Sequence, residues 1–267
     1  MDEERALLPR WDWFAVLAVG LGLFELLRRT VIVTSNPNLV PALLFVGAAV
    51  VPTAFVVFIY GRPIAFDVPG GVLAAVAVTG GVVGVVVAGT WEYDTVRHLG
   101  LFSMLGVGVI EETAKLIVPA TVLLVLRRYH HPADGLLLGV ASGAGFAALE
   151  TMGYAFVTLV TSKGDLSAGD GVLALRGALS PAAHMAWTGL VAAALGIAIL
   201  EHWSRPATIR FVLATGAAIA LHTAWDSIGT TPAYLVIAGV GLGSLTAVSH
   251  RLRGRPLCAG RTPSAAA

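Results

Sequence analysis

Charged and histidine side chains occur inside apolar stretches that are long enough to cross a lipid bilayer. Glu111 and Glu112 lie in one such stretch, and Glu150 lies in the next. His184 and His222 lie in two further stretches. A charged side chain near the bilayer centre costs roughly 2.5–3.5 kcal/mol on insertion scales. Such residues are retained where they are paired, bound to an ion or used in a function, so these five positions constrain both fold and chemistry.

The composition is that of a polytopic membrane protein. Hydrophobic residues make up 57% of the 267 positions and charged residues only 12%, and the mean hydropathy is +0.83. A soluble core does not absorb that much apolar surface. The formal net charge of +1 argues neither for a nucleic-acid partner nor for an acidic one, and no nucleic-acid partner is expected. The single cysteine, Cys258, lies in a polar tail, which excludes disulfides, thiolate metal sites and cysteine catalysis.

Apolar runs of spanning length predict an all-α bundle of about eight transmembrane helices. Their approximate ranges are 14–27, 39–60, 70–90, 99–126, 135–160, 179–202, 208–228 and 232–249. The fourth run is long enough to be tilted or broken near Pro119. Segment 161–178 is expected to be an outer-side turn, and 251–267 a basic, disordered tail. We therefore predict one transmembrane domain over residues 1–267, with a catalytic half at about 99–228.

Basic residues are distributed unevenly between the two sides of this topology. With eight spans, both termini share one side, which carries eleven arginines, whereas the opposite side carries five basic residues. Cytoplasmic loops of membrane proteins carry the excess of lysine and arginine. The distribution predicts a multi-pass protein of the plasma membrane with both termini in the cytoplasm. At about 1.5 Å of rise per residue, the intramembrane glutamates and histidines then fall in the outer half of the membrane.

Several of these polar residues are spaced to share one face of a helix. Glu111 and Lys115 are four residues apart, as are His222 and Asp226, and side chains at that spacing are neighbours. Within each pair, the two side chains are expected to interact with each other on one helix and to face a common cavity. One intramembrane lysine cannot neutralise three glutamates and an aspartate, so a purely structural set of ion pairs is the less favoured interpretation.

Two histidines and a glutamate from separate helices form a His₂Glu set, a pattern of catalytic zinc sites that leaves a fourth position for water. We predict Glu150, His184 and His222 as the metal ligands, with a further carboxylate as general base. Asp226 could fix the tautomer of His222, and Lys115 could balance the charge of a neighbouring glutamate. The residues leave open a metal-free alternative, in which a glutamate and a histidine activate water directly.

Four sequence blocks that carry these residues resemble the motifs of one known family. The blocks are Glu111-Glu112-x-x-Lys115, Gly145-Phe146-x-x-x-Glu150, Arg176 followed by His184, and His222-x-x-x-Asp226. In this order they resemble the PrsW intramembrane proteases, distant relatives of the type II CAAX prenyl endopeptidases and the Abi proteins. The resemblance covers about residues 100–230. One departure is Thr151, where PrsW-like sequences often have asparagine.

The resemblance implies an intramembrane endopeptidase. The catalytic residues that we predict are Glu111, Glu112, His184 and His222. The residues expected to orient or balance them are Lys115, Arg176 and Asp226. PrsW-like enzymes make the first, outer-side cut in a membrane-anchored anti-sigma factor. The implied partner is therefore a single-span membrane protein in the lipid bilayer, and the candidate cofactor is zinc.

Three other classes of protein stay open as alternatives. A proton-coupled secondary transporter also uses buried glutamate, histidine and aspartate, but it is expected to have inverted repeats, which we do not find. A rhomboid-type serine protease needs a serine–histidine dyad, for which Ser142 and His222 are the nearest match; that dyad leaves the paired glutamates unexplained. A family member without catalysis could act as a membrane scaffold, although the motif set is intact.

Overall fold

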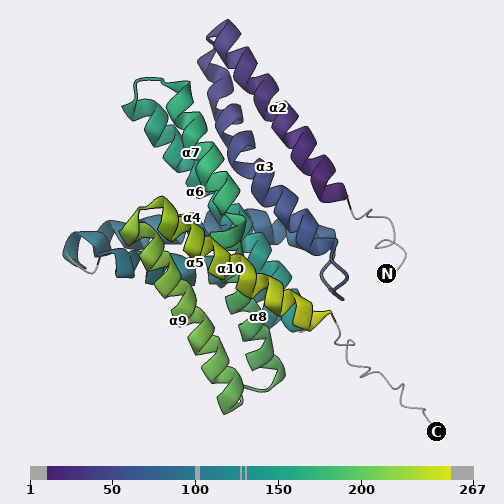
Figure 1. The fold of residues 1–267 in the computed structure, drawn as a ribbon. Coiled ribbons are helices and arrows are strands. Elements are labelled where there is room, and N and C mark those ends of the chain that lie inside the picture. Colours follow the sequence, from purple (N-terminus) through teal and green to yellow (C-terminus); the bar gives the residue numbers. More distant parts are fainter. Residues whose placement is uncertain (1–10, 100–102, 127, 130, 254–267) are drawn as a thin grey trace.

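A long helix forms at each of the predicted apolar runs. The computed structural model describes residues 11–99, 103–126, 128–129 and 131–253, but not the side chains of residues 94–99. Those residues form helices and no strand (Figure 1). The helices are α2 (Asp12–Thr34), α3 (Val40–Tyr60), α4 (Gly70–Leu99), α5 (Ser103–Val125), α6 (Pro132–Thr161), α7 (Leu166–Leu179), α8 (Ala186–Leu200), α9 (Arg205–Ile228) and α10 (Thr231–Leu252). A 3-10 turn precedes α3 and a π-helical segment joins α7 to α8.

Six helical segments are long and apolar enough to cross a membrane. They are Pro37–Tyr60, Gly70–Tyr93, Pro132–Thr161, Leu166–Leu200, Arg205–Ile228 and Thr231–Leu252. The helices α2 and α5 also coincide with predicted spans but contain more charged residues; α5 carries Glu111, Glu112 and Lys115. The all-α, polytopic fold is therefore confirmed. Of the predicted tail, residues 254–267 lie outside the described part of the chain.

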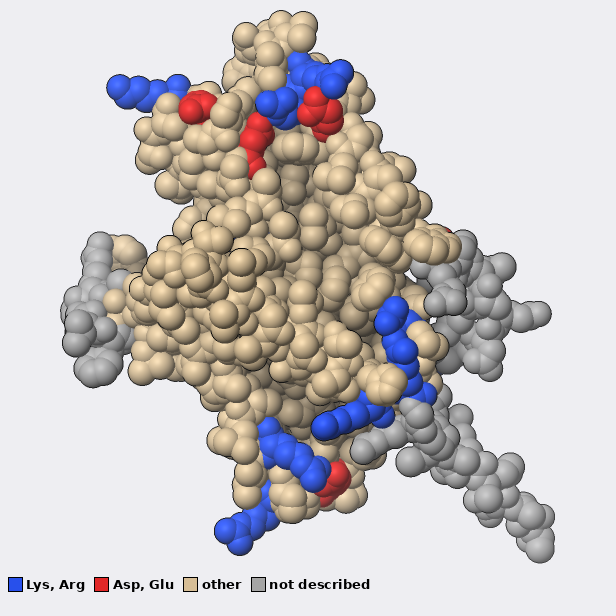
Figure 2. Space-filling model, viewed as in Figure 1, with Lys and Arg blue, Asp and Glu red and all other residues tan. Residues whose placement is uncertain are grey.

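On one face of the molecule, charged side chains gather at two ends and leave an uncharged belt between them (Figure 2). On the face drawn in Figure 2, they collect over the ends of α2 and α7 and, opposite, near α8, α9 and α10. Ion pairs lie at both ends: Arg28 Nε is 2.6 Å from Asp170 Oδ2, and Arg210 Nη1 is 3.6 Å from Glu201 Oε1. An apolar belt between charged ends is the surface that a bilayer requires.

The helix α6 is the centre of the bundle. It packs against α3, α4, α5, α7 and α8, and its first half is almost entirely buried. Glycines allow the close contacts: Gly139 lies against the main-chain oxygen of Thr188 in α8, and Gly145 lies against that of Ala77 in α4. A side chain at either glycine would overlap the neighbouring backbone, so these residues set the distance between the helices.

The chain is helical in most of the segment where the sequence predicts an outer-side turn, 161–178, so that prediction is wrong. Helix α7 begins after Asp165, whose side chain accepts a hydrogen bond from the main-chain N–H of Ser167. Its apolar face packs on α3 and α6 around the buried side chain of Leu173. Glycine and aspartate weaken the helix propensity of this segment, but burial of the apolar face outweighs that weakness.

One span is interrupted, but at Pro181 and not near Pro119. Helix α5 continues through Pro119 without a break. Between α7 and α8, residues Pro181–Met185 form the π segment, in which Ala183 has φ −104° and ψ −107°. Proline removes a backbone donor and clashes with the preceding turn, which accounts for the position of the irregularity. Such π-helical turns are frequent at functional sites, and this one contains His184.

Candidate active site

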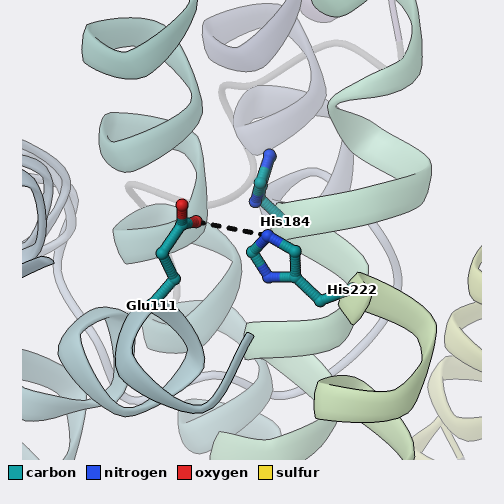
Figure 3. Close-up of side chains that lie close together, drawn as sticks. All are labelled: Glu111, His184 and His222. Carbon is teal, nitrogen blue, oxygen red and sulfur yellow. Dashed lines mark ion pairs between the residues drawn. The ribbon is translucent and has the colours of Figure 1, made fainter. Parts of the chain in front are cut away.

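The polar residues of three separate helical segments converge in one buried cluster. Helix α5 supplies Glu111, Glu112 and Lys115, the π segment supplies His184, and α9 supplies His222. All five residues are at least 93% buried. Figure 3 shows Glu111 and the two histidines pointing toward one another. The spacing within each helix predicts a common interior site, and the three segments do bring these residues together.

Lys115 lies in the middle of the cluster. Its Nζ atom is 3.0 Å from Glu111 Oε2 and 2.8 Å from Glu112 Oε1. The same atom is 2.8 Å from His184 Nδ1 and lies 4.4 Å from the centroid of the Phe146 ring. The ammonium group therefore offsets the charge of two adjacent carboxylates that could not otherwise be buried side by side.

The two nitrogens of His184 have different partners. A lysine ammonium only donates hydrogen bonds, so Nδ1 of His184 accepts from Lys115. Its Nε2 atom, which then carries the proton, lies 3.1 Å from Glu150 Oε2 in α6. The same Glu150 oxygen is 2.7 Å from Arg176 Nη2 in α7, and Arg176 stacks 4.0 Å from the centroid of the Tyr154 ring. Glu150 and Arg176 thereby hold the imidazole of His184 in place.

His222 is held mainly by Glu112. Its Nδ1 atom is 2.7 Å from Glu112 Oε1 and donates to it, while Lys115 Nζ lies farther away, at 3.4 Å. In the neutral imidazole, Nε2 then carries the lone pair. That nitrogen is 3.4 Å from Glu111 Oε2 and 3.3 Å from Asp226 Oδ2. The sequence spacing predicts Asp226 as the residue that fixes the tautomer, but Glu112 makes the shorter contact.

Glu111, His184 and His222 form the group that could hold a metal ion. Each offers one ligand atom, and these atoms lie within 4.8 Å of one another. The 3.4 Å between Glu111 Oε2 and His222 Nε2 agrees with the roughly 3.3–3.6 Å expected between ligands bound at about 2.0–2.2 Å in a tetrahedral site. Glu111 Oε2 is also buried and accepts no well-oriented hydrogen bond. The donor set therefore fits a metal ion. Its carboxylate is Glu111 and not Glu150, the ligand predicted from the sequence. Glu150 instead contacts His184 and the Arg176 guanidinium.

Aromatic rings enclose the two histidines. The centroid of the Trp187 ring is 5.9 Å from that of His184 and 5.5 Å from that of His222, and the Phe146 ring is 5.6 Å from His184. Buried rings exclude water and strengthen the charge interactions around them. Trp187 is not among the site residues predicted from the sequence. Its only signal was its position three residues after His184, which places it on the same helical face.

Ser142 is bound to the main chain of a neighbouring helix and is not arranged as a nucleophile. Its Oγ atom donates to the carbonyl oxygen of Lys115 over 2.7 Å, and it lies against Gly80 in α4. We expect Ser142→Ala to retain proteolysis and to lower stability by about 1 kcal/mol, the typical value of one hydrogen bond. Turnover and thermal unfolding of the purified variant test this. Complete loss of activity in a folded Ser142→Ala variant would instead favour a serine mechanism.

A comparison with protein families identifies the chain. The model of the PrsW family intramembrane metalloproteases matches residues 68–251, which is more than half of the sequence. The chain belongs to the PrsW family. It is therefore a membrane-embedded peptide hydrolase with several membrane-spanning helices. Neither the curated proteins nor the solved structures contain a match to it.

The family match is longer than the motif resemblance. It begins before α4 and ends in α10, whereas the motifs cover about residues 100–230. Helix α4, in which the sequence shows no family motif, is thus part of the matched region. Because the family is one of metalloproteases, a metal ion in the group formed by Glu111, His184 and His222 is chemically plausible in this PrsW-family protease.

Proposed function

We propose that this protease hydrolyses a peptide bond of a membrane-anchored protein at the group formed by Glu111, His184 and His222. The observation that carries the proposal is the convergence of these three donors, with Glu112 and Glu150 each contacting one imidazole. A carboxylate that holds a histidine in this way is the usual support of a metal-binding imidazole. We propose zinc because two imidazoles and a carboxylate are a ligand set of catalytic zinc sites.

In this proposal, the residues around the three metal donors have different roles. A bound zinc ion would polarise the scissile carbonyl group and supply an activated water. Glu112 and Glu150 keep the histidines in one orientation. For His184 to bind the ion through Nδ1, the Lys115 ammonium, 2.8 Å from that nitrogen, would have to move away. Lys115 and Arg176 offset the carboxylate charges, and Trp187 shields the group from bulk water. The preorganised charges can then act on the substrate in surroundings of low dielectric constant.

We also propose that the substrate is a single-span membrane protein, such as an anti-sigma factor, cut near the extracytoplasmic side of the plasma membrane. The family resemblance supports the substrate class. The excess of arginine on the side of both termini supports the orientation. His184 and His222 lie in two of the segments that are long and apolar enough to cross a membrane, so a substrate segment has to reach the cluster from within or beside the bilayer.

The orientation predicts which turns a membrane-impermeant thiol reagent can reach. Lys163, after α6, and His202, after α8, are both exposed and lie on opposite sides of the proposed topology. In a Cys258→Ser background, Lys163→Cys is expected to react when the reagent is added outside intact cells, and His202→Cys is expected to react only after lysis. The reverse pattern would overturn the proposed orientation and the proposed side of cleavage.

The proposed function can be tested with purified protein and a panel of single-span substrates. We expect the wild type to cleave at least one of them, a chelator to stop cleavage, and zinc to restore it. The Glu111→Gln variant keeps the size of the side chain and is expected to accumulate normally but to cleave nothing. Cleavage that the chelator does not affect would favour the metal-free alternative. A wild type inactive on every substrate would count against the proposal.

A further inference from the structure

Glu92, near the end of α4, is a carboxylate that has no role in the arrangement described so far. It is the second-last residue of the membrane-spanning stretch Gly70–Tyr93, and it is partly buried. Its Oε1 atom is inaccessible to water and has no hydrogen-bond partner. An unpartnered carboxylate oxygen inside a membrane protein is costly, and ionisable residues at such positions mark functional sites.

The packing of α4 directs Glu92 toward the cluster. Gly84 lies against the Phe146 ring, and Ala88, one turn later, is buried with Phe146 and residues of α5. Glu92 follows Ala88 by four residues, so the three positions share one face of α4. That face packs on α5 and α6, the helices that carry the glutamates of the cluster. Glu92 therefore lies on the face of α4 that is turned toward the helices of the active-site group, one turn beyond Ala88.

The charges around Glu92 distinguish it from the other carboxylates. Glu92 lies close enough to four residues of the cluster to interact with them electrostatically: Glu111, Lys115, Glu150 and His222. Glu111, Glu112 and Glu150 each have a lysine or arginine nitrogen within 3.0 Å, from Lys115 or Arg176, and Asp226 is exposed to solvent. Among the side chains that the structure describes, Glu92 has no such partner. It is thus the carboxylate that is free to accept a proton.

We propose that Glu92 is the catalytic residue that takes up and returns the proton during hydrolysis. As the water oxygen bonds to the carbonyl carbon of the substrate, one water proton moves to a Glu92 oxygen. When the bond between carbon and nitrogen breaks, Glu92 gives that proton to the leaving nitrogen, and the other water proton stays with the new carboxyl group. The carboxylate is regenerated, and no other reactant is needed. This role rests on the proposed proteolytic function.

The test compares Glu92→Gln with a matched variant, Glu25→Gln, in the purified full-length protein. Glu25 is also a carboxylate of a long helix, but it pairs with Arg29 in α2, 2.6 Å away. A positioned general base contributes typically 10²–10⁴-fold, so we expect Glu92→Gln to lower kcat by about that factor. KM, accumulation and bound metal are expected to stay at the wild-type level. Glu92→Asp, which keeps a carboxylate, is expected to retain part of the activity, and Glu25→Gln all of it.

Two results would overturn the role of Glu92. One is a Glu92→Gln variant with wild-type kcat on a substrate that the wild type cleaves. The other is a Glu92→Gln variant that loses its metal or fails to accumulate while Glu25→Gln is normal, since Glu92 would then be structural. A wild type that cleaves no substrate is a different result. It would contradict the proteolytic function itself, on which the role of Glu92 depends.

Discussion

The His222→Ala variant is expected to have no measurable proteolytic activity, whereas Asp226→Asn is expected to lose only about 10–100-fold. The imidazole of His222 contacts Glu112 through Nδ1 and faces Glu111 through Nε2. Alanine removes both contacts and one of the three candidate metal donors. Asp226 lies 3.3 Å from Nε2 and its side chain is 27% accessible, and its replacement leaves intact the shorter contact with Glu112 that orients the ring.

Activity of the purified variants, together with their accumulation in membranes, measures this difference. His202→Ala is the matched control, because this histidine is exposed in the turn after α8. It is expected to behave as the wild type. If Asp226→Asn is as inactive as His222→Ala while both accumulate normally, Asp226 is itself a ligand or a catalytic group, and the tasks assigned to Glu112 and Asp226 are wrong.

Gly143→Ala is expected to abolish or severely reduce activity although Gly143 has no chemical role. A Cβ atom at this position would lie 2.5 Å from the main-chain oxygen of His184 and 2.9 Å from Met185 Cα. Backbone cannot move aside as a flexible side chain can, so α6 and the π segment would have to separate. A displacement of about 1 Å at a catalytic group can cost about 10²-fold in rate.

Gly153→Ala is the matched control for this prediction. Gly153 lies in the same helix, and nothing lies within 4 Å of a Cβ atom built there. Replacing a helical glycine by alanine typically stabilises a helix by up to about 1 kcal/mol, so Gly153→Ala should be at least as stable as the wild type. Thermal unfolding and turnover of both variants test whether the close contact at Gly143 is needed for activity. A Gly143→Ala variant as active as Gly153→Ala would show that the close contact does not position His184.

The helices and the membership of the cluster could be predicted because both are local properties of the sequence. Apolar runs of spanning length locate the helices, and the spacing of four residues places Glu111 with Lys115 and His222 with Asp226. Polar residues in such runs have to meet in the interior, which indicates their convergence without any contact being known. The α-helical fold and the family follow from these two patterns.

Partners on different helices could not be predicted, because they depend on how the helices pack. The contact of Glu112 with His222 and that of Glu150 with Arg176 cross from one element to another. Glu92 lies at the end of a run without a motif, and only the packing of α4 on α6 brings it near the site. Helix α7 was missed for a related reason, since tertiary burial decides the structure of a segment whose own propensity is weak.

Metal analysis of the purified protein tests the central claim most directly. We predict about one zinc ion per chain in the wild type and a large loss of zinc from Glu111→Gln, His184→Ala and His222→Ala. Glu150→Gln, which alters only a partner of His184, is expected to weaken binding by about 10–100-fold and to refill at high zinc concentration. Zinc retained in the first three variants, or lost irreversibly from Glu150→Gln alone, would contradict the assignment of Glu111, His184 and His222 as the metal-binding group.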